Sequence, residues 1–191
     1  MLITLSAFLP SLALAQVYTY TFTAKESGDL SGVNSFYDKY SWTVTSSCSG
    51  TACSTSTAPI PPETPGSLPS PAPDPLGFNY TYKEVIVIDG IDIVLLPGKD
   101  YTLGENSSLT ILSSPNKTKA GALIMTGASL GTSTGSSPSI IFSTFTSAGG
   151  TINVADGGRL VAAEYGVIEL NNKASGSVGP RLRWVPKGIL Q

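Results

Sequence analysis

The chain has 191 residues, a net charge of −2 with 13% charged side chains, and no histidine. A sparsely charged, slightly acidic chain offers no basic surface for phosphate backbones, so we expect no nucleic-acid partner. The absence of histidine removes the commonest metal ligand and the commonest general base at neutral pH. We therefore expect no metal site and no Ser-His-Asp or Cys-His chemistry, and no motif indicates a cofactor.

Residues 1–15 form an apolar run that ends in Ala13-Leu14-Ala15, the small-x-small pattern that signal peptidases recognise. The run is shorter than the roughly 20 residues that a membrane-spanning helix needs. It therefore predicts a cleaved signal peptide and a secreted protein without a membrane span. The alternative is an uncleaved anchor that lies at the membrane interface.

Two short segments follow in which aromatic and hydroxyl residues alternate. Residues 17–23 alternate tyrosine and phenylalanine with threonine, and residues 40–45 alternate Tyr40, Trp42 and Val44 with serine and threonine. Alternation with a period of two is typical of half-buried strands. We expect these strands to share one face.

Cys48 and Cys53 are the chain's only cysteines, and four residues separate them. In an oxidising compartment this pair predicts a structural disulfide that closes a small loop. The alternative, a redox-active pair, would require Cys-x-x-Cys spacing beside the start of a helix.

Residues 54–77 contain eight of the chain's 14 prolines, together with many serines and threonines. Proline cannot donate a backbone hydrogen bond, so the segment predicts a disordered, polyproline-like spacer that is a candidate for O-glycosylation. Residues 16–53 are too few to fold alone, so we expect them to pack on the main domain across this spacer.

The main β domain is expected at residues 78–191, where short apolar segments alternate with turns. Asp89-Gly90 is among the strongest two-residue hairpin signals. Closely spaced strands and hairpin turns favour an all-β fold, an antiparallel β-sandwich or barrel. The alternative is a short parallel β-helix, because apolar triplets between Gly, Asp and Asn corners in residues 149–170 resemble its stacked turns. Strands are expected at residues 78–82, 84–88, 91–96, 108–112, 122–126, 139–146, 151–154, 159–163, 167–170 and 181–185.

Three Asn-x-Ser/Thr sequences, at Asn79, Asn106 and Asn116, are candidate N-glycosylation sites. Asn106 and Asn116 lie in predicted turns, where a glycosyltransferase can reach them. Asn79 lies in a predicted strand and is the least secure of the three.

Four residues are candidates for a binding surface. Trp42 belongs to the aromatic rows, which either stack against sugar rings or fill the core. Near the C-terminus, Arg181 and Arg183 share one face of a predicted strand and Trp184 lies on the other. This pattern indicates either a basic edge strand or a binding surface.

An enzyme without histidine would depend on carboxylates, as glycosidases do. Asp89, Asp92, Glu164 and Glu169 lie near predicted strands or turns, but no spacing among them demands catalysis. The sequence therefore favours a non-catalytic secreted or cell-wall-associated protein that binds polysaccharide or an extracellular protein, such as an effector. The alternatives are a carboxylate-dependent carbohydrate-active enzyme and a purely structural surface component.

Overall fold

The computed structural model describes residues 16–25, 34–50, 53, 60–68, 80–130, 139–171 and 181–184. Within these residues the chain forms strands and one short 3-10 helix, η1 (Lys39–Ser41), and no α-helix. The expectation of an all-β protein is confirmed. The predicted signal peptide, residues 1–15, lies outside the described residues.

Most strands belong to three sheets, which we call A, B and C. Sheet A has the order β12 (Thr151–Val154), β7 (Ser107–Leu112), β4 (Tyr80–Asp89), β1 (Gln16–Ala24) and β3 (Trp42–Ser49). Sheet B has the order β13 (Arg159–Ala162), β8 (Ala122–Met125), β5 (Asp92–Leu95) and β2 (Asn34–Ser35). Sheet C has the order β15 (Arg181–Trp184), β14 (Gly166–Asn171), β11 (Ser143–Ala148) and β6 (Asp100–Leu103). The strands β9 (Ala128–Leu130) and β10 (Ser139–Ile141) pair only with each other in the described residues.

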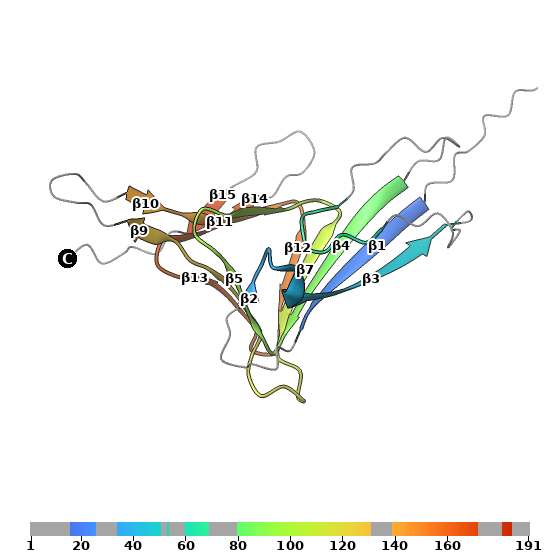
Figure 1. The fold of residues 1–191 in the computed structure, drawn as a ribbon, viewed down its shortest axis with the longest axis horizontal. Helices are drawn as coiled ribbons and strands as arrows, with labels where there is room; N and C mark the ends of the chain where they lie inside the picture. The colour runs from blue at the N-terminus through green and yellow to red at the C-terminus, as the bar shows by residue number, and fades with distance from the viewer. Residues whose placement is uncertain are drawn as a thin grey trace, which may run out of the picture.

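The chain visits the three sheets in turn, so that its strands wind into a coil. One turn of the coil is β4, β5 and β6, the next is β7, β8 and β11, and the third is β12, β13 and β14. Equivalent strands of successive turns pair in parallel, as β4 does with β7 and β5 with β8. Figure 1 shows the sheets as the sides of a triangle, with the hairpin of β9 and β10 at one corner.

The expected antiparallel sandwich or barrel is not confirmed, because eight of the eleven strand pairs in the described part of the chain are parallel. Antiparallel pairing joins β1 to β3, β9 to β10 and β14 to β15. The winding fits the alternative expectation, a short parallel β-helix. Short strands produce this winding when the loop after each strand directs the chain to the next sheet rather than back onto the same sheet.

Asp89-Gly90 is the clearest example of this difference. The dipeptide was expected to close a hairpin, but β4 before it lies in sheet A and β5 after it lies in sheet B. Gly90 has a φ of 68°, which a hairpin turn and a corner can both use. The prediction of a hairpin was wrong because a local turn signal does not determine which strand becomes the partner.

The core is built from in-register columns of apolar side chains inside the coil. Phe22 of β1 is in register with Ile86 of β4, which is in register with Leu109 of β7. All three side chains are completely buried. A fully buried side chain of this size contributes about 1.5–3 kcal/mol through removal from water. In these strands, side chains that alternate in the sequence point alternately to the inside and the outside of the coil.

Strand β1 joins the beginning of the chain to the coil. It pairs in parallel with β4 from Gln16↔Tyr80 to Thr23↔Val87, and in antiparallel fashion with β3 on its other side. Since β7 pairs with β4 only from Glu84 onward, β1, β3 and β4 extend beyond the other strands of sheet A (Figure 1).

Part of the proline-rich segment is also placed against the coil. Of residues 54–77, the structure describes residues 60–68, in which Pro65 is buried and Leu68 packs against the core. The backbone N–H of Gly66 donates to Glu84 Oε1 at 2.6 Å. The other residues of the segment lie outside the description, so the expectation of disorder stays a prediction for them.

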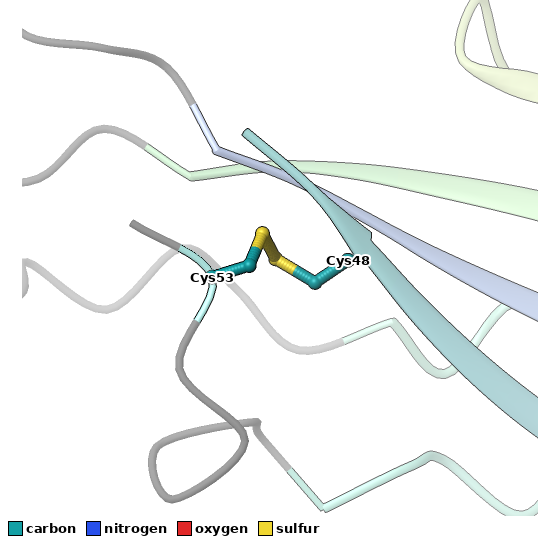
Figure 2. Close-up of a disulfide and its surroundings, with 2 residues drawn as sticks. All are labelled: Cys48 and Cys53. Carbon is teal, nitrogen blue, oxygen red and sulfur yellow. A yellow bond between two sulfur atoms is a disulfide. The ribbon is translucent and has the colours of Figure 1, made fainter. Parts of the chain in front are cut away.

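The disulfide between Cys48 and Cys53 is confirmed, with a Cα–Cα distance of 5.8 Å (Figure 2). Cys48 lies on β3, where it is in register with Tyr18 of β1 and packs partly against the core. The bond therefore ties the chain leaving β3 to the end of that strand.

Candidate functional site

A surface hollow of about 340 Å³ lies where η1 and the start of β3 meet the proline-rich segment. Its volume is at the small end of the range for ligand sites. The hollow is lined by two lysines, two aromatic residues, one valine, two prolines and one glutamate: Lys25, Lys39, Tyr40, Trp42, Val44, Pro61, Pro62 and Glu63.

Tyr40 is placed at the hollow by the short helix η1. Asp38 caps this helix, since its side chain accepts a hydrogen bond from the backbone N–H of Tyr40 at 2.9 Å. The sequence predicted that Tyr40 would share a buried strand face with Trp42, but the helical turn rotates Tyr40 outward. Its side chain is 74% exposed, which is unusual for an aromatic residue and leaves the ring available to a ligand.

Trp42 also lines the hollow and belongs to the core. Its side chain is 2% exposed, and its ring packs edge-on against Phe22 and Phe36. Its indole N–H donates to the carbonyl of Phe36 at 3.0 Å. Trp42 therefore supports the floor of the hollow and presents little surface of its own for stacking.

Residues 61–63 form another part of the lining, and Glu84 holds the same segment at Gly66. The Glu84 carboxylate is 3% exposed; it accepts the N–H of Gly66 with one oxygen and the hydroxyl of Tyr101 with the other. Burial of Tyr101, and then the negative charge of Glu84, raise the pKa of the Tyr101 hydroxyl above its ordinary value of 10.0. Tyr101 therefore stays neutral and keeps donating its proton to the carboxylate.

Glu84 was not predicted to be a structural carboxylate, although the sequence carries a signal for it. Glu84 lies two and four residues before Ile86 and Ile88, so alternation places all three on the inner face of one strand. An acidic residue in such a position needs a buried donor. The identity of that donor, Tyr101, depends on the winding of the coil and has no local signal.

Three charged side chains give the hollow its electrostatic character. Lys39 Nζ lies 3.7 Å from Glu63 Oε1 and 5.3 Å from the centre of the Tyr40 ring. Lys25 lines the same hollow, and it makes no ion pair with any carboxylate of the described residues. Among the described residues, the lining thus carries one positive charge that no carboxylate pairs with.

The four carboxylates considered for catalysis are not gathered at this hollow. Asp89 accepts the backbone N–H of Ser114 at 2.8 Å and so fixes a turn. Glu164 is exposed in the turn before β14. Glu169 lies on β14, in register with Arg183 of β15.

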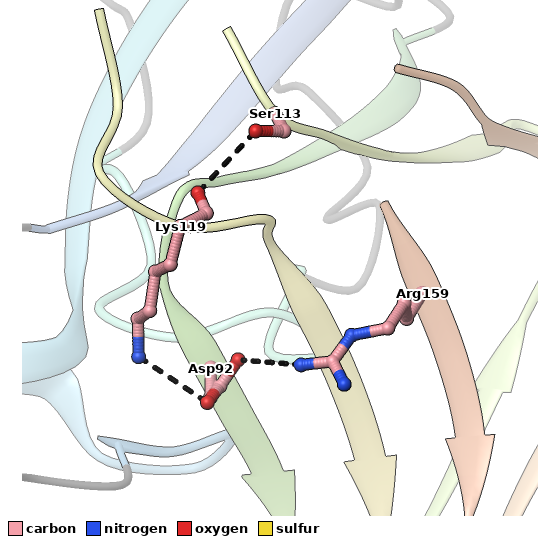
Figure 3. Close-up of polar contacts among 4 residues, drawn as sticks. All are labelled: Asp92, Ser113, Lys119 and Arg159. Atoms are coloured by element: carbon pink, nitrogen blue, oxygen red, sulfur yellow. Dashed lines mark hydrogen bonds and ion pairs between the residues drawn. The ribbon is translucent and has the colours of Figure 1, made fainter. Parts of the chain in front are cut away.

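Asp92 makes ion pairs with two cations, Lys119 from the next turn of the coil and Arg159 from the turn after that (Figure 3). Its carboxylate lies 3.2 Å from Lys119 Nζ and 3.8 Å from an Arg159 guanidinium nitrogen. Ser113 donates to the carbonyl of Lys119 at 3.4 Å and helps to hold that loop. Partly exposed pairs of this kind contribute about 0–1 kcal/mol each, so the cluster joins adjacent turns of the coil without strong stabilisation.

The C-terminal candidates for binding lie at the edge of sheet C. Strand β15, which carries Arg181, Arg183 and Trp184, pairs only with β14 among the described strands. Its position agrees with an edge strand. The structure describes the backbone of these residues and not their side chains, so their role in binding stays a prediction.

Two of the three candidate glycosylation sites are accessible. Asn106 lies in the turn between β6 and β7, Asn116 lies in the turn after β7, and both side chains are exposed. Asn79 lies outside the described residues.

No family model, no curated protein and no solved structure matches this chain. Among the described residues, no helix is long and apolar enough to cross a membrane. In the same part of the chain, no three side chains of histidine, cysteine, aspartate or glutamate gather as metal ligands.

Proposed function

We propose that this protein is a non-catalytic, secreted or cell-wall-associated binding module, built as a short parallel β-helix, whose ligand is an extracellular polysaccharide. The ligand would lie in the hollow formed by η1, the start of β3 and residues 61–63. The observation that carries the proposal is the 74% exposure of Tyr40, a ring held by a capped helical turn at the edge of a ligand-sized hollow.

The chemistry of the lining supports a sugar ligand. A sugar ring presents C–H groups on its faces and hydroxyls around its edge, so it needs an aromatic or apolar platform flanked by polar groups. Tyr40, Pro61 and Pro62 provide the platform, while Lys39 and Glu63 provide a donor and an acceptor. The proline-rich segment and the floor are already fixed by Glu84 and Trp42, so little ordering is needed on binding.

The carboxylate-dependent enzyme receives less support from the same hollow. Hydrolysis of a glycosidic bond uses two carboxyl groups about 5–10 Å apart. The lining contains one carboxylate, Glu63, and its partner is Lys39. We therefore favour binding over catalysis.

Secretion and glycosylation belong to the proposal as well. The apolar run at residues 1–15, the disulfide between Cys48 and Cys53, and the exposed Asn106 and Asn116 support an oxidising, extracellular compartment. Mass spectrometry of the protein secreted by a eukaryotic host should detect glycans on Asn106 and Asn116.

The proposal is tested by affinity electrophoresis of the folded protein through gels that contain neutral or acidic cell-wall polysaccharides. At least one polysaccharide should retard the wild-type protein, and Tyr40→Ala should weaken this binding tenfold or more because the stacking platform is lost. Phe142→Ala is the matched control, since Phe142 is an exposed aromatic residue outside the hollow. The proposal is wrong if no polysaccharide retards the protein, or if Tyr40→Ala behaves like the control.

A further inference from the structure

We infer that the hollow selects acidic polysaccharides, in which Lys25 binds the carboxylate of a uronic acid while Tyr40 stacks on a sugar ring. This inference rests on the proposed function and names the class of ligand for the same site. It begins from the charges that line the hollow, which are two lysines and one glutamate.

The two lysines differ in how far their charges are offset. Lys39 has an acidic neighbour, since its ammonium lies 3.7 Å from the Glu63 carboxylate. Lys25 has no such neighbour among the described residues. Within the described part of the chain, Lys25 is therefore the lysine of the hollow whose charge is available to an anion.

The protein as a whole does not attract anions, because its net charge is −2. A preference for acidic ligands must therefore come from local charge. Surface charges separated by more than about 8–10 Å are largely screened at physiological salt, so the side chains that line the hollow dominate.

The backbone holds Lys25 and Tyr40 in a fixed relation. Lys25 follows the last residue of β1, and its backbone N–H donates to the carbonyl of Ser41 at 2.9 Å. Ser41 directly follows Tyr40 in η1. The backbone of Lys25 is thus hydrogen-bonded to the residue next to Tyr40, which holds the cation and the aromatic ring near each other. This arrangement suits a ligand that carries a ring and a carboxylate in each repeating unit.

The experiment compares acidic tetrasaccharides with their own neutral methyl esters by isothermal titration calorimetry. The tetramers are β-1,4-glucuronate, α-1,4-galacturonate and β-1,4-mannuronate, so that the sugar and its linkage vary, while within each pair the ester differs only by its neutral, methylated carboxyl groups. At low salt, at least one acidic tetramer should bind about threefold to fivefold more tightly than its ester, the range expected for one partly exposed ion pair. The preference should shrink in about 0.5 M sodium chloride, because salt screens the pair.

Two variants assign the preference to Lys25. Lys25→Gln should bind the acidic tetramer and its ester almost equally, because the charge that distinguishes the two ligands is removed. Lys99→Gln is the matched control, because Lys99 is an exposed lysine outside the hollow, and it should keep the wild-type preference.

Other outcomes overturn the inference without confusing it with the proposed function. Equal binding of acid and ester by the wild-type protein, or an unchanged preference in Lys25→Gln, shows that Lys25 does not select charge. Failure of all three acidic tetramers also overturns the inference, while retardation by a neutral polysaccharide would leave the proposed function in place. Tetraglutamate that binds as tightly as the best tetramer would show a general anion site, and the requirement for a sugar would be wrong.

Discussion

At the scale of single residues, the buried carboxylate of Glu84 links the core to the hollow. A buried charged group costs several kcal/mol unless donors replace its water. Glu84 receives the hydroxyl of Tyr101 and the N–H of Gly66, one for each carboxylate oxygen. The hydrogen bond from Gly66 attaches the proline-rich segment to the coil. Glu84, a residue of the core, therefore also helps to shape the surface.

Replacing Tyr101 with phenylalanine should therefore destabilise the protein at neutral pH. The change removes one donor from a buried carboxylate, for which a loss of about 1.5–3 kcal/mol in the free energy of unfolding is expected. Urea unfolding at pH 7 measures this loss. Tyr40→Phe removes the hydroxyl of a largely exposed ring and should leave the free energy of unfolding unchanged at this pH.

Tyr101→Phe should also change how the free energy of unfolding responds to alkaline pH. Because burial raises the pKa of Tyr101 in the folded state, stability is complete below the unfolded pKa of about 10 and falls as pH rises above it. Tyr101→Phe should show a shallower fall above pH 10. Some fall should remain, since burial also raises the pKa values of Tyr20, Tyr37 and Tyr82. A fall as steep as that of the wild-type protein would contradict this role of Tyr101.

At the scale of elements, the corners between sheets determine how closely successive turns of the coil can stack. Gly158 lies at the corner between β12 and β13, and a Cβ atom there would lie 2.3 Å from the carbonyl oxygen of Ile111. Gly166, at the start of β14, would place a Cβ atom 2.3 Å from the carbonyl oxygen of Met125. Both neighbours are backbone atoms of the preceding turn, so neither clash can be relieved by rotation of a side chain.

Gly158→Ala should consequently lower the free energy of unfolding by about 1–3 kcal/mol, the usual cost of overpacking. Gly104→Ala is the matched control, because no atom lies within 4 Å of a Cβ atom at that position. Equilibrium denaturation of the two variants measures the difference. Equal stability of Gly158→Ala and Gly104→Ala would mean that the turns of the coil are not in close contact at this corner.

The elements also show what the sequence could predict about the fold. Inside-outside alternation in β1 follows from a local period-two pattern and was predicted, as were the positions of most strands. The direction of strand pairing was not predicted, because Asp89-Gly90 is equally compatible with a hairpin and with a corner between two sheets. The strand at residues 139–146 was predicted as one element, whereas the chain forms β10 and β11 in different sheets.

At the scale of the whole molecule, the hollow exists only because distant segments meet. Lys25 directly follows β1, Tyr40 belongs to η1, and Pro61, Pro62 and Glu63 come from the proline-rich segment. From sequence, Trp42 was the binding candidate of this region, since strand alternation gives no reason to expect that Tyr40 is exposed. The site could not be predicted because it depends on the return of residues 60–68 to the coil through Glu84.

The measurement that tests the binding site most directly is a two-dimensional NMR titration of the isotope-labelled protein with the tightest-binding tetrasaccharide. If the hollow is the site, the largest changes in amide chemical shift should fall on residues 38–44 and on the backbone amides of Lys25 and Glu63, which line it. Amides of β10, which precedes the exposed Phe142, should change little. Changes concentrated on β10 or β15, with residues 38–44 unaffected, would contradict binding at the hollow.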